Sequence, residues 1–217
     1  CTVFCVNASA QINMALLGDS IIDDYLGPSD LIGTNTNLAA GSFGQILAET
    51  RSDNFNFGTY KAPTTTNTDA WDSIRNFGYE YNWATAGATA SAQEINLDFT
   101  GASTPGYVSI PVASNLSVQV AGLAPSISSG DVDTAVIMVG PNDFFYHTNV
   151  VDTVEGGLYP ATDGAIDDDF INLVADSILT GIDTLQDAGE VEIILALLAT
   201  IPTMTKEEID GVAAVNA

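Results

Sequence analysis

The stretch MALLGDS, residues 14–20, decides the fold. Four apolar residues run without a break into glycine, aspartate and serine, which is typical of a strand buried on both faces of a parallel sheet. A turn and a helix are expected to follow, because parallel strands are joined by long crossover connections. The stretch therefore predicts an α/β fold in which Ser20 lies just past the carboxyl end of the first strand.

The rest of the chain alternates between strand-like and helix-like patterns. The further strand-like segments are residues 80–85, 134–139 and 190–200. The helix-like segments are residues 42–50, 116–123 and 165–188, followed by a helix opened by a capping box at 205–208. Phe43, Ile46 and Leu47 are expected on one helix face, and residues 51–76 on a long surface loop. This alternation predicts a parallel sheet with helices on both sides.

The composition limits the partners of the chain. It has 28 acidic and 4 basic residues and a formal net charge of −24, which excludes nucleic acid as a default partner and disfavours anionic membranes. No apolar run approaches the roughly 20 residues that span a bilayer. Hydrophobic residues make up 46 % of the chain, enough for a sizeable core. A salt-screened, marine or halophilic extracellular setting fits the acidity, and a simple gain in solubility is the alternative.

The N-terminus suggests the end of a secretory signal. Residues 1–6 are largely apolar and 8–10 read Ala-Ser-Ala, the small-residue pattern that signal peptidase cuts. We therefore interpret residues 1–10 as a signal remnant and 11–217 as a single domain; a hydrophobic first strand is the alternative. Cys1 and Cys5 support neither a disulfide framework nor a metal site, and no cofactor or metal is expected.

Segments of small or polar residues follow three of the predicted strands. They are Gly18-Asp19-Ser20, Ala86-Gly87-Ala88 and Gly140-Pro141-Asn142-Asp143. Ligands of parallel sheets bind at the carboxyl ends of strands. A serine hydroxyl there, with a glycine N–H and an asparagine amide as neutral donors, suits acyl transfer through an oxyanion. Ordinary turn composition is the alternative.

The acidic residues near these strand ends admit a second interpretation. Asp19, Asp23, Asp24 and Asp143 have the composition of a metal-binding or glycosidase-type carboxylate set. We favour turn and capping roles for them. Asp167, which opens an acidic triplet at the start of the 165–188 segment, is likewise assigned to helix capping.

In order and placement, the three polar segments resemble the blocks of the SGNH (GDSL) hydrolases, a family of ester hydrolases. The resemblance runs from about residue 14 to the end of the chain. It implies a flavodoxin-like three-layer α/β/α sandwich with a parallel sheet. It also implies that Ser20 is the nucleophile, and that the Ser20 N–H, the Gly87 N–H and the Asn142 side chain form the oxyanion hole.

One block of the family is missing from the sequence. SGNH enzymes carry a C-terminal Asp-x-x-His motif, whose histidine is the general base. The single histidine here is His147, with Phe144 three residues before it. The resemblance therefore implies a domain incomplete at its C-terminus, with the histidine and aspartate beyond residue 217. A substitute base at His147, expected in a loop bordering the site, is the weaker alternative.

Two function classes follow from these observations. The first is a secreted serine esterase that acts on neutral small-molecule or polysaccharide esters, with an acyltransferase using the same residues. The second is a non-catalytic carbohydrate- or surface-binding module on the same scaffold. The oligomeric state stays open.

Overall fold

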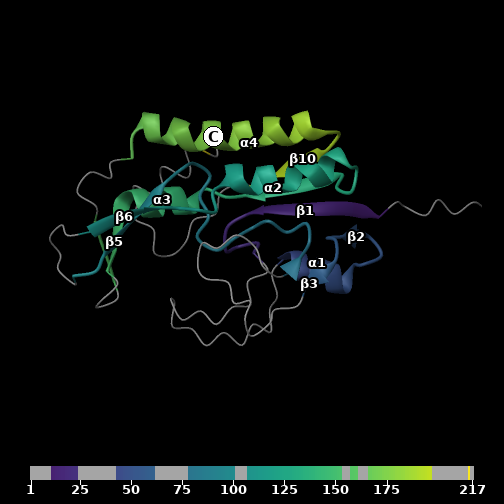
Figure 1. Cartoon of the computed structure of the whole chain (residues 1–217), viewed down its shortest axis with the longest axis horizontal. Helices are drawn as coiled ribbons and strands as arrows, with labels where there is room; N and C mark the ends of the chain where they lie inside the picture. The colour runs from purple at the N-terminus through teal and green to yellow at the C-terminus, as the bar shows by residue number, and fades with distance from the viewer. Residues whose placement is uncertain are drawn as a thin grey trace, which may run out of the picture.

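The computed structural model describes residues 11–23, 43–61, 78–100, 107–152, 157–160, 166–196 and 215 (Figure 1). The interpretations of residues 1–10, of Asp24 and of the helix that begins at 205 fall outside these ranges. Within them, no helix combines the length and apolar character that crossing a membrane requires.

The fold is built on a central sheet of four parallel strands. Its strand order is β10-β7-β1-β2, formed by β1 (Ile12–Gly18), β2 (Phe55–Asn56), β7 (Thr134–Met138) and β10 (Glu192–Leu195). Three of these strands lie within or overlap the predicted segments at 14–17, 134–139 and 190–200. The prediction of an α/β fold with a parallel sheet is therefore confirmed.

Successive residues of β1 pack into two different cores. Ala15 and Leu17 belong to a core shared with α2 (Leu116–Ser128) and α4 (Asp168–Ala188). Met14 and Leu16 belong to a second core, to which α1 (Phe43–Thr50) contributes Leu47. Side chains alternate between the faces of a strand, so an unbroken apolar run fills both cores. Figure 1 shows α2 and α4 above β1 and α1 below it.

The predicted helices at 42–50, 116–123 and 165–188 form, with two corrections. In α4, Asp167 caps the helix, because its Oδ1 accepts the Phe170 N–H at 2.9 Å. In α1, Phe43 and Ile46 are 44 % and 48 % exposed, so the expected apolar face is only partly buried among the described residues. The Asn142 to His147 segment, expected as a loop, belongs to helix α3 (Pro141–Thr148).

Residues 80–85 lie where the second strand is expected, but they do not form a regular strand. Their backbone runs parallel to β1 and pairs with it at Leu16 and Gly18. Asn82 interrupts the strand because its Oδ1 accepts the Ala84 N–H at 3.0 Å and its Nδ2 donates to the Ile22 carbonyl at 3.1 Å. The bond to Ala84 is local, and local side-chain bonds compete with a strand ladder.

A second sheet was not expected. It has the order β6-β5-β8-β9, formed by β5 (Glu94–Asp98), β6 (Tyr107–Pro111), β8 (Asn149–Asp152) and β9 (Gly157–Pro160). The expected 51–76 surface loop is also wrong in part, since it contains β2, the buried Phe57 and β3 (Tyr60–Lys61), which pairs with β4 (Gly78–Tyr79). The second sheet lies beyond the carboxyl end of β1, next to α3 (Figure 1).

Candidate functional site

Ser20 lies in a tight turn that directly follows β1. The Asp19 carbonyl accepts the N–H groups of Ile22 and Asp23 at 3.2 and 3.1 Å, and the Asp19 carboxylate accepts the Ile21 N–H at 3.0 Å. In this turn Asp19 and Ile22 are buried and Ser20 is exposed. The turn therefore presents the Ser20 hydroxyl to solvent at the carboxyl end of the sheet.

Gly87 lies in a loop that is bound to the turn of Ser20. The Thr85 N–H donates to the Gly18 carbonyl at 2.9 Å, and the Ala86 N–H donates to Asp23 Oδ2 at 2.8 Å. Gly87 has a φ of 86°, a left-handed conformation that glycine adopts without strain. The second predicted segment is thus fixed beside the first.

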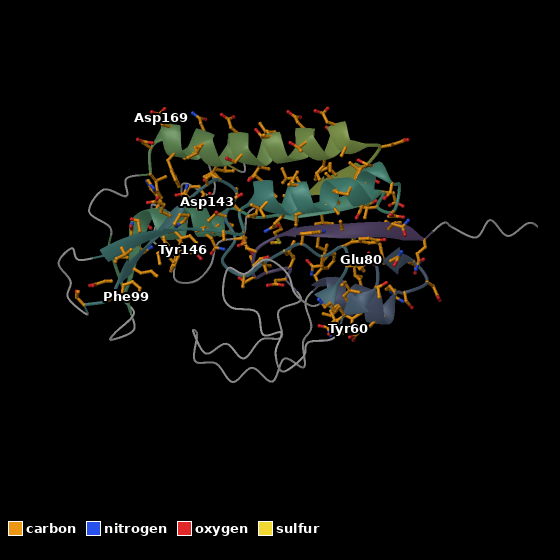
Figure 2. All side chains as sticks on the ribbon, in the orientation of Figure 1. Tyr60, Glu80, Phe99, Asp143, Tyr146 and Asp169 are labelled. Carbon is orange, nitrogen blue, oxygen red and sulfur yellow. The ribbon has the colours of Figure 1, made fainter. Side chains whose placement is uncertain are left out.

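The third segment forms the start of α3. Pro141 is at the first helical turn, and Asn142 Nδ2 donates to the Ala88 carbonyl at 2.8 Å. The buried Asp143 carboxylate accepts the Ala90 N–H at 2.7 Å, the Ser91 N–H at 2.9 Å and the Ser91 hydroxyl at 2.6 Å. These four bonds hold the start of α3 against the loop that contains Gly87 (Asp143 is labelled in Figure 2).

Three donors of the site are left available by this arrangement. Among the described residues, neither the Ser20 N–H nor the Gly87 N–H has a hydrogen-bond acceptor. Asn142 uses one of its two amide hydrogens on Ala88, and an amide carries two. The structure therefore links the segments of Ser20, Gly87 and Asn142 through hydrogen bonds and keeps polar hydrogens at each position.

Two buried carboxyl groups lie under the site. Burial raises the pKa of Asp19 from 3.8 to about 6, and repulsion from Asp143 adds to the effect. Burial also raises the pKa of Asp143 from 3.8 to about 6, although the bonds from Ser91 and Ala90 act in the opposite direction. Both groups are therefore destabilised in their charged form.

These raised values predict that the protein is more stable at mildly acidic pH. A carboxyl whose pKa is higher in the folded than in the unfolded state contributes stability below its unfolded value, and loses it as the pH rises to the folded value. The free energy of unfolding is expected to fall between pH 3.8 and about 6. Urea titrations of Asp19→Asn should show a smaller fall, and the exposed Asp183→Asn, which removes the same charge, should match the unmodified protein. Equal slopes in all three proteins would contradict the prediction.

Asp19 takes the turn role that we favoured, whereas Asp23 and Asp143 bind backbone N–H groups of a distant segment. Asp19, Asp23 and Asp143 each accept at least one backbone N–H. Within the described ranges, no cluster of three or more histidine, cysteine or acidic side chains has the geometry to hold a metal ion.

His147 is placed on the last turn of α3 and not in a loop. It lies five residues after Asn142, about 7.5 Å along a helix axis. Its ring stacks on Phe170 of α4, with ring centroids 3.8 Å apart and an angle of 15° between the planes. This contact gives His147 a packing role between two helices.

The sequence interpretation missed two polar residues that shape the site, Ser91 and Gln119. Ser91 forms two of the bonds to Asp143. Gln119 lies on the buried face of α2, among Leu116, Val120 and Leu123. A glutamine on an otherwise apolar helix face is an available signal, because a buried amide needs polar partners.

The fold and these contacts define a class of protein. It is an α/β protein in which the turn of Ser20, the loop of Gly87 and Asn142 of α3 are joined at the carboxyl end of the parallel sheet. Beyond this class, no family model, curated protein or solved structure matches the chain.

Proposed function

We propose that the protein is a serine ester hydrolase of the SGNH type, with a flavodoxin-like fold. In this proposal the Ser20 hydroxyl attacks the ester carbonyl carbon and forms a tetrahedral intermediate. The Ser20 N–H, the Gly87 N–H and the Asn142 amide donate hydrogen bonds to its oxyanion. Collapse of the intermediate expels the alcohol, and water then releases the acid from Ser20.

The observation that carries the proposal is the set of bonds that joins the three segments. Asp23 accepts the Ala86 N–H beside Gly87, and Asn142 donates to Ala88 on the other side of Gly87. Preorganised donors stabilise a developing charge without having to reorient during the reaction. An arrangement of turn residues with no chemistry would not require an exposed serine in a turn that is hydrogen-bonded to a glycine loop with an unengaged N–H.

The proposal requires a general base for Ser20, since a serine hydroxyl is a weak nucleophile at neutral pH. SGNH enzymes supply it from an Asp-x-x-His motif, and we propose the same source here. Experiments on activity therefore use the full-length gene product.

The charge of the chain supports neutral substrates. A protein with 28 acidic and 4 basic residues repels anionic esters such as phospholipids during encounter. We propose short-chain acyl esters or acetylated polysaccharides as substrates, and a secreted protein in a saline setting, where salt screens the repulsion among acidic side chains.

Covalent labelling tests the proposal directly. A fluorophosphonate reacts with activated serines, and is expected to label Ser20 in the full-length product. Proteolysis on the N-terminal side of aspartate isolates residues 19–22, which contain a single serine, so mass spectrometry can assign the label. The exposed Ser129, whose hydroxyl donates to Asp131, is the internal control and should stay unlabelled. Absence of label at Ser20 would favour the binding module.

Replacement of His147 distinguishes a base from a packing residue. His147→Phe keeps an aromatic ring against Phe170 and removes both ring nitrogens. We expect the turnover of p-nitrophenyl acetate by the full-length product to stay within about threefold, because in this proposal His147 takes no part in the chemistry and the new ring keeps the contact with Phe170. A loss of about 100-fold or more, the range for general-base catalysis, would show that His147 takes part in the chemistry.

A further inference from the structure

Gln119 of α2 binds the backbone at the end of β1. Its Oε1 accepts the Gly18 N–H at 2.7 Å, and its Nε2 donates to the Gly18 carbonyl at 2.9 Å and to the Ser114 carbonyl at 3.1 Å. The side chain is 2 % exposed. One acceptor and two donors are thus all used, which fixes the orientation of the amide group.

Gln119 takes the place of a missing strand partner. Along residues 81–85, Leu16 donates to the Tyr81 carbonyl and accepts from the Trp83 N–H. If this parallel pattern continued two residues later, Gly18 would accept the Thr85 N–H and donate to the Trp83 carbonyl. The first of these two bonds is present. The Gly18 N–H bonds to Gln119 instead, so the ladder ends here on a side chain from another layer of the fold.

The position of Gly18 gives this contact its importance. Gly18 precedes Asp19, whose carbonyl and carboxylate form the turn that presents Ser20. Glycine has more backbone freedom than any other residue, so the direction in which the turn leaves the sheet has to be fixed by external contacts. Gln119 holds both polar groups of Gly18.

We propose that Gln119 is a positioning residue, which orients the Ser20 hydroxyl and N–H for attack by clamping the Gly18 backbone from α2. This inference rests on the proposed esterase function. Gln119 itself touches no reacting atom in this scheme. Its effect on the reaction passes through Gly18 and Asp19, so its loss is expected to lower kcat with little change in KM.

The structural half of the proposal is tested without any assay of activity. Gln119→Met keeps the length of the side chain and removes its three hydrogen bonds. Val120→Ala is the matched control, because it trims the buried face of α2 one residue further along and leaves the clamp intact. In Gln119→Met, the ratio of the amide exchange rate at Gly18 to that at Leu16, measured by NMR, should rise about fivefold. This is the effect expected for the loss of one hydrogen bond. In Val120→Ala the two amides should change together.

The functional half uses p-nitrophenyl acetate and the full-length product. We expect Gln119→Met to lower kcat by about 100-fold, the effect of a small misplacement of a reacting group. Gln119→Glu supplies a second readout, because its carboxylate keeps the acceptor for Gly18 and faces the carbonyls of Gly18 and Ser114. Its kcat relative to the unmodified protein should rise as the pH falls and the new carboxyl gains a proton to donate.

Each outcome decides the proposal. Equal exchange at Gly18 in Gln119→Met and Val120→Ala would overturn the clamp. Faster exchange with equal kcat in these two variants, or a Gln119→Glu profile parallel to that of the unmodified protein, would overturn the positioning role. A full-length product without Ser20-dependent turnover would overturn the esterase function and the positioning role together, while the exchange data still report whether Gln119 holds Gly18.

Discussion

Ser20→Ala is expected to lower kcat for p-nitrophenyl acetate by about 10⁴-fold or more in the full-length product, as for other serine nucleophiles. The alanine cannot form an acyl-enzyme, although the Gly87 N–H and the Asn142 amide can still stabilise a charge. Stability should hardly change, because Ser20 is exposed and its side chain has no hydrogen bond among the described residues. The measurement is a steady-state assay of both proteins, with melting curves beside it.

The control for this prediction is Ser129→Ala, which removes an exposed hydroxyl that only bonds to its own loop and helix end. It should retain the full turnover. Residual turnover of a few per cent or more in Ser20→Ala, with an unchanged pH profile, would show that another group attacks the ester and would remove Ser20 from the mechanism.

Gly18→Ala is expected to prevent folding or to lower the free energy of unfolding by more than about 4 kcal/mol. A Cβ built on Gly18 lies 2.0 Å from the Met138 carbonyl oxygen. That oxygen belongs to the backbone of β7, which is paired with β1 on one side and β10 on the other. The Met138 carbonyl therefore cannot move away without breaking the central sheet. Urea unfolding followed by circular dichroism measures the effect.

Gly130→Ala is the matched control, since Gly130 has a φ of 77° and a Cβ there would meet no atom within 4 Å. Only backbone strain opposes this substitution, so a loss of about 1–2 kcal/mol is expected. If both variants lost the same stability, the crowding at Gly18 would not be real.

The elements that the sequence predicted well are those whose apolar pattern is continuous or strongly periodic. β7 lies within the predicted 134–139 strand, and α4 buries Phe170, Val174, Ile178 and Leu185 on one stripe. Their pattern is set by burial against the sheet, and burial is what a sequence pattern records. The same periodic pattern places Leu173 on this stripe as well, and that prediction is wrong, because Leu173 is 48 % exposed.

The missed elements depend on contacts between residues far apart in the chain. The β5 segment Glu-Ile-Asn-Leu-Asp alternates, but it is only five residues long, and its strand partners are distant β8 and the adjacent β6. Helix α3 begins at Pro141 in a segment that resembles a turn, and it is held by bonds from Asp143 to Ala90 and Ser91. Local propensity carries little information about such tertiary contacts.

The residues of the candidate site also fall into two groups, those that the sequence predicts and those that it misses. Ser20, Gly87 and Asn142 follow directly from their positions after apolar segments, because the carboxyl ends of parallel strands meet at one edge. Gln119 does not follow from any local rule, since its partner Gly18 is 101 residues away. The sequence can mark the residues of such an edge, but the contacts that hold them in place appear only in the structure.

The alternation of β1 between two cores restricts how this protein can change its length. Ala15 and Leu17 fill one core while Met14 and Leu16 fill the other. Neither face of this part of the strand is therefore exposed to solvent. Deleting or inserting one residue within β1 would send every following side chain into the opposite core. Natural or engineered length variation is therefore expected to avoid this strand and to accumulate in segments that lack such two-sided packing.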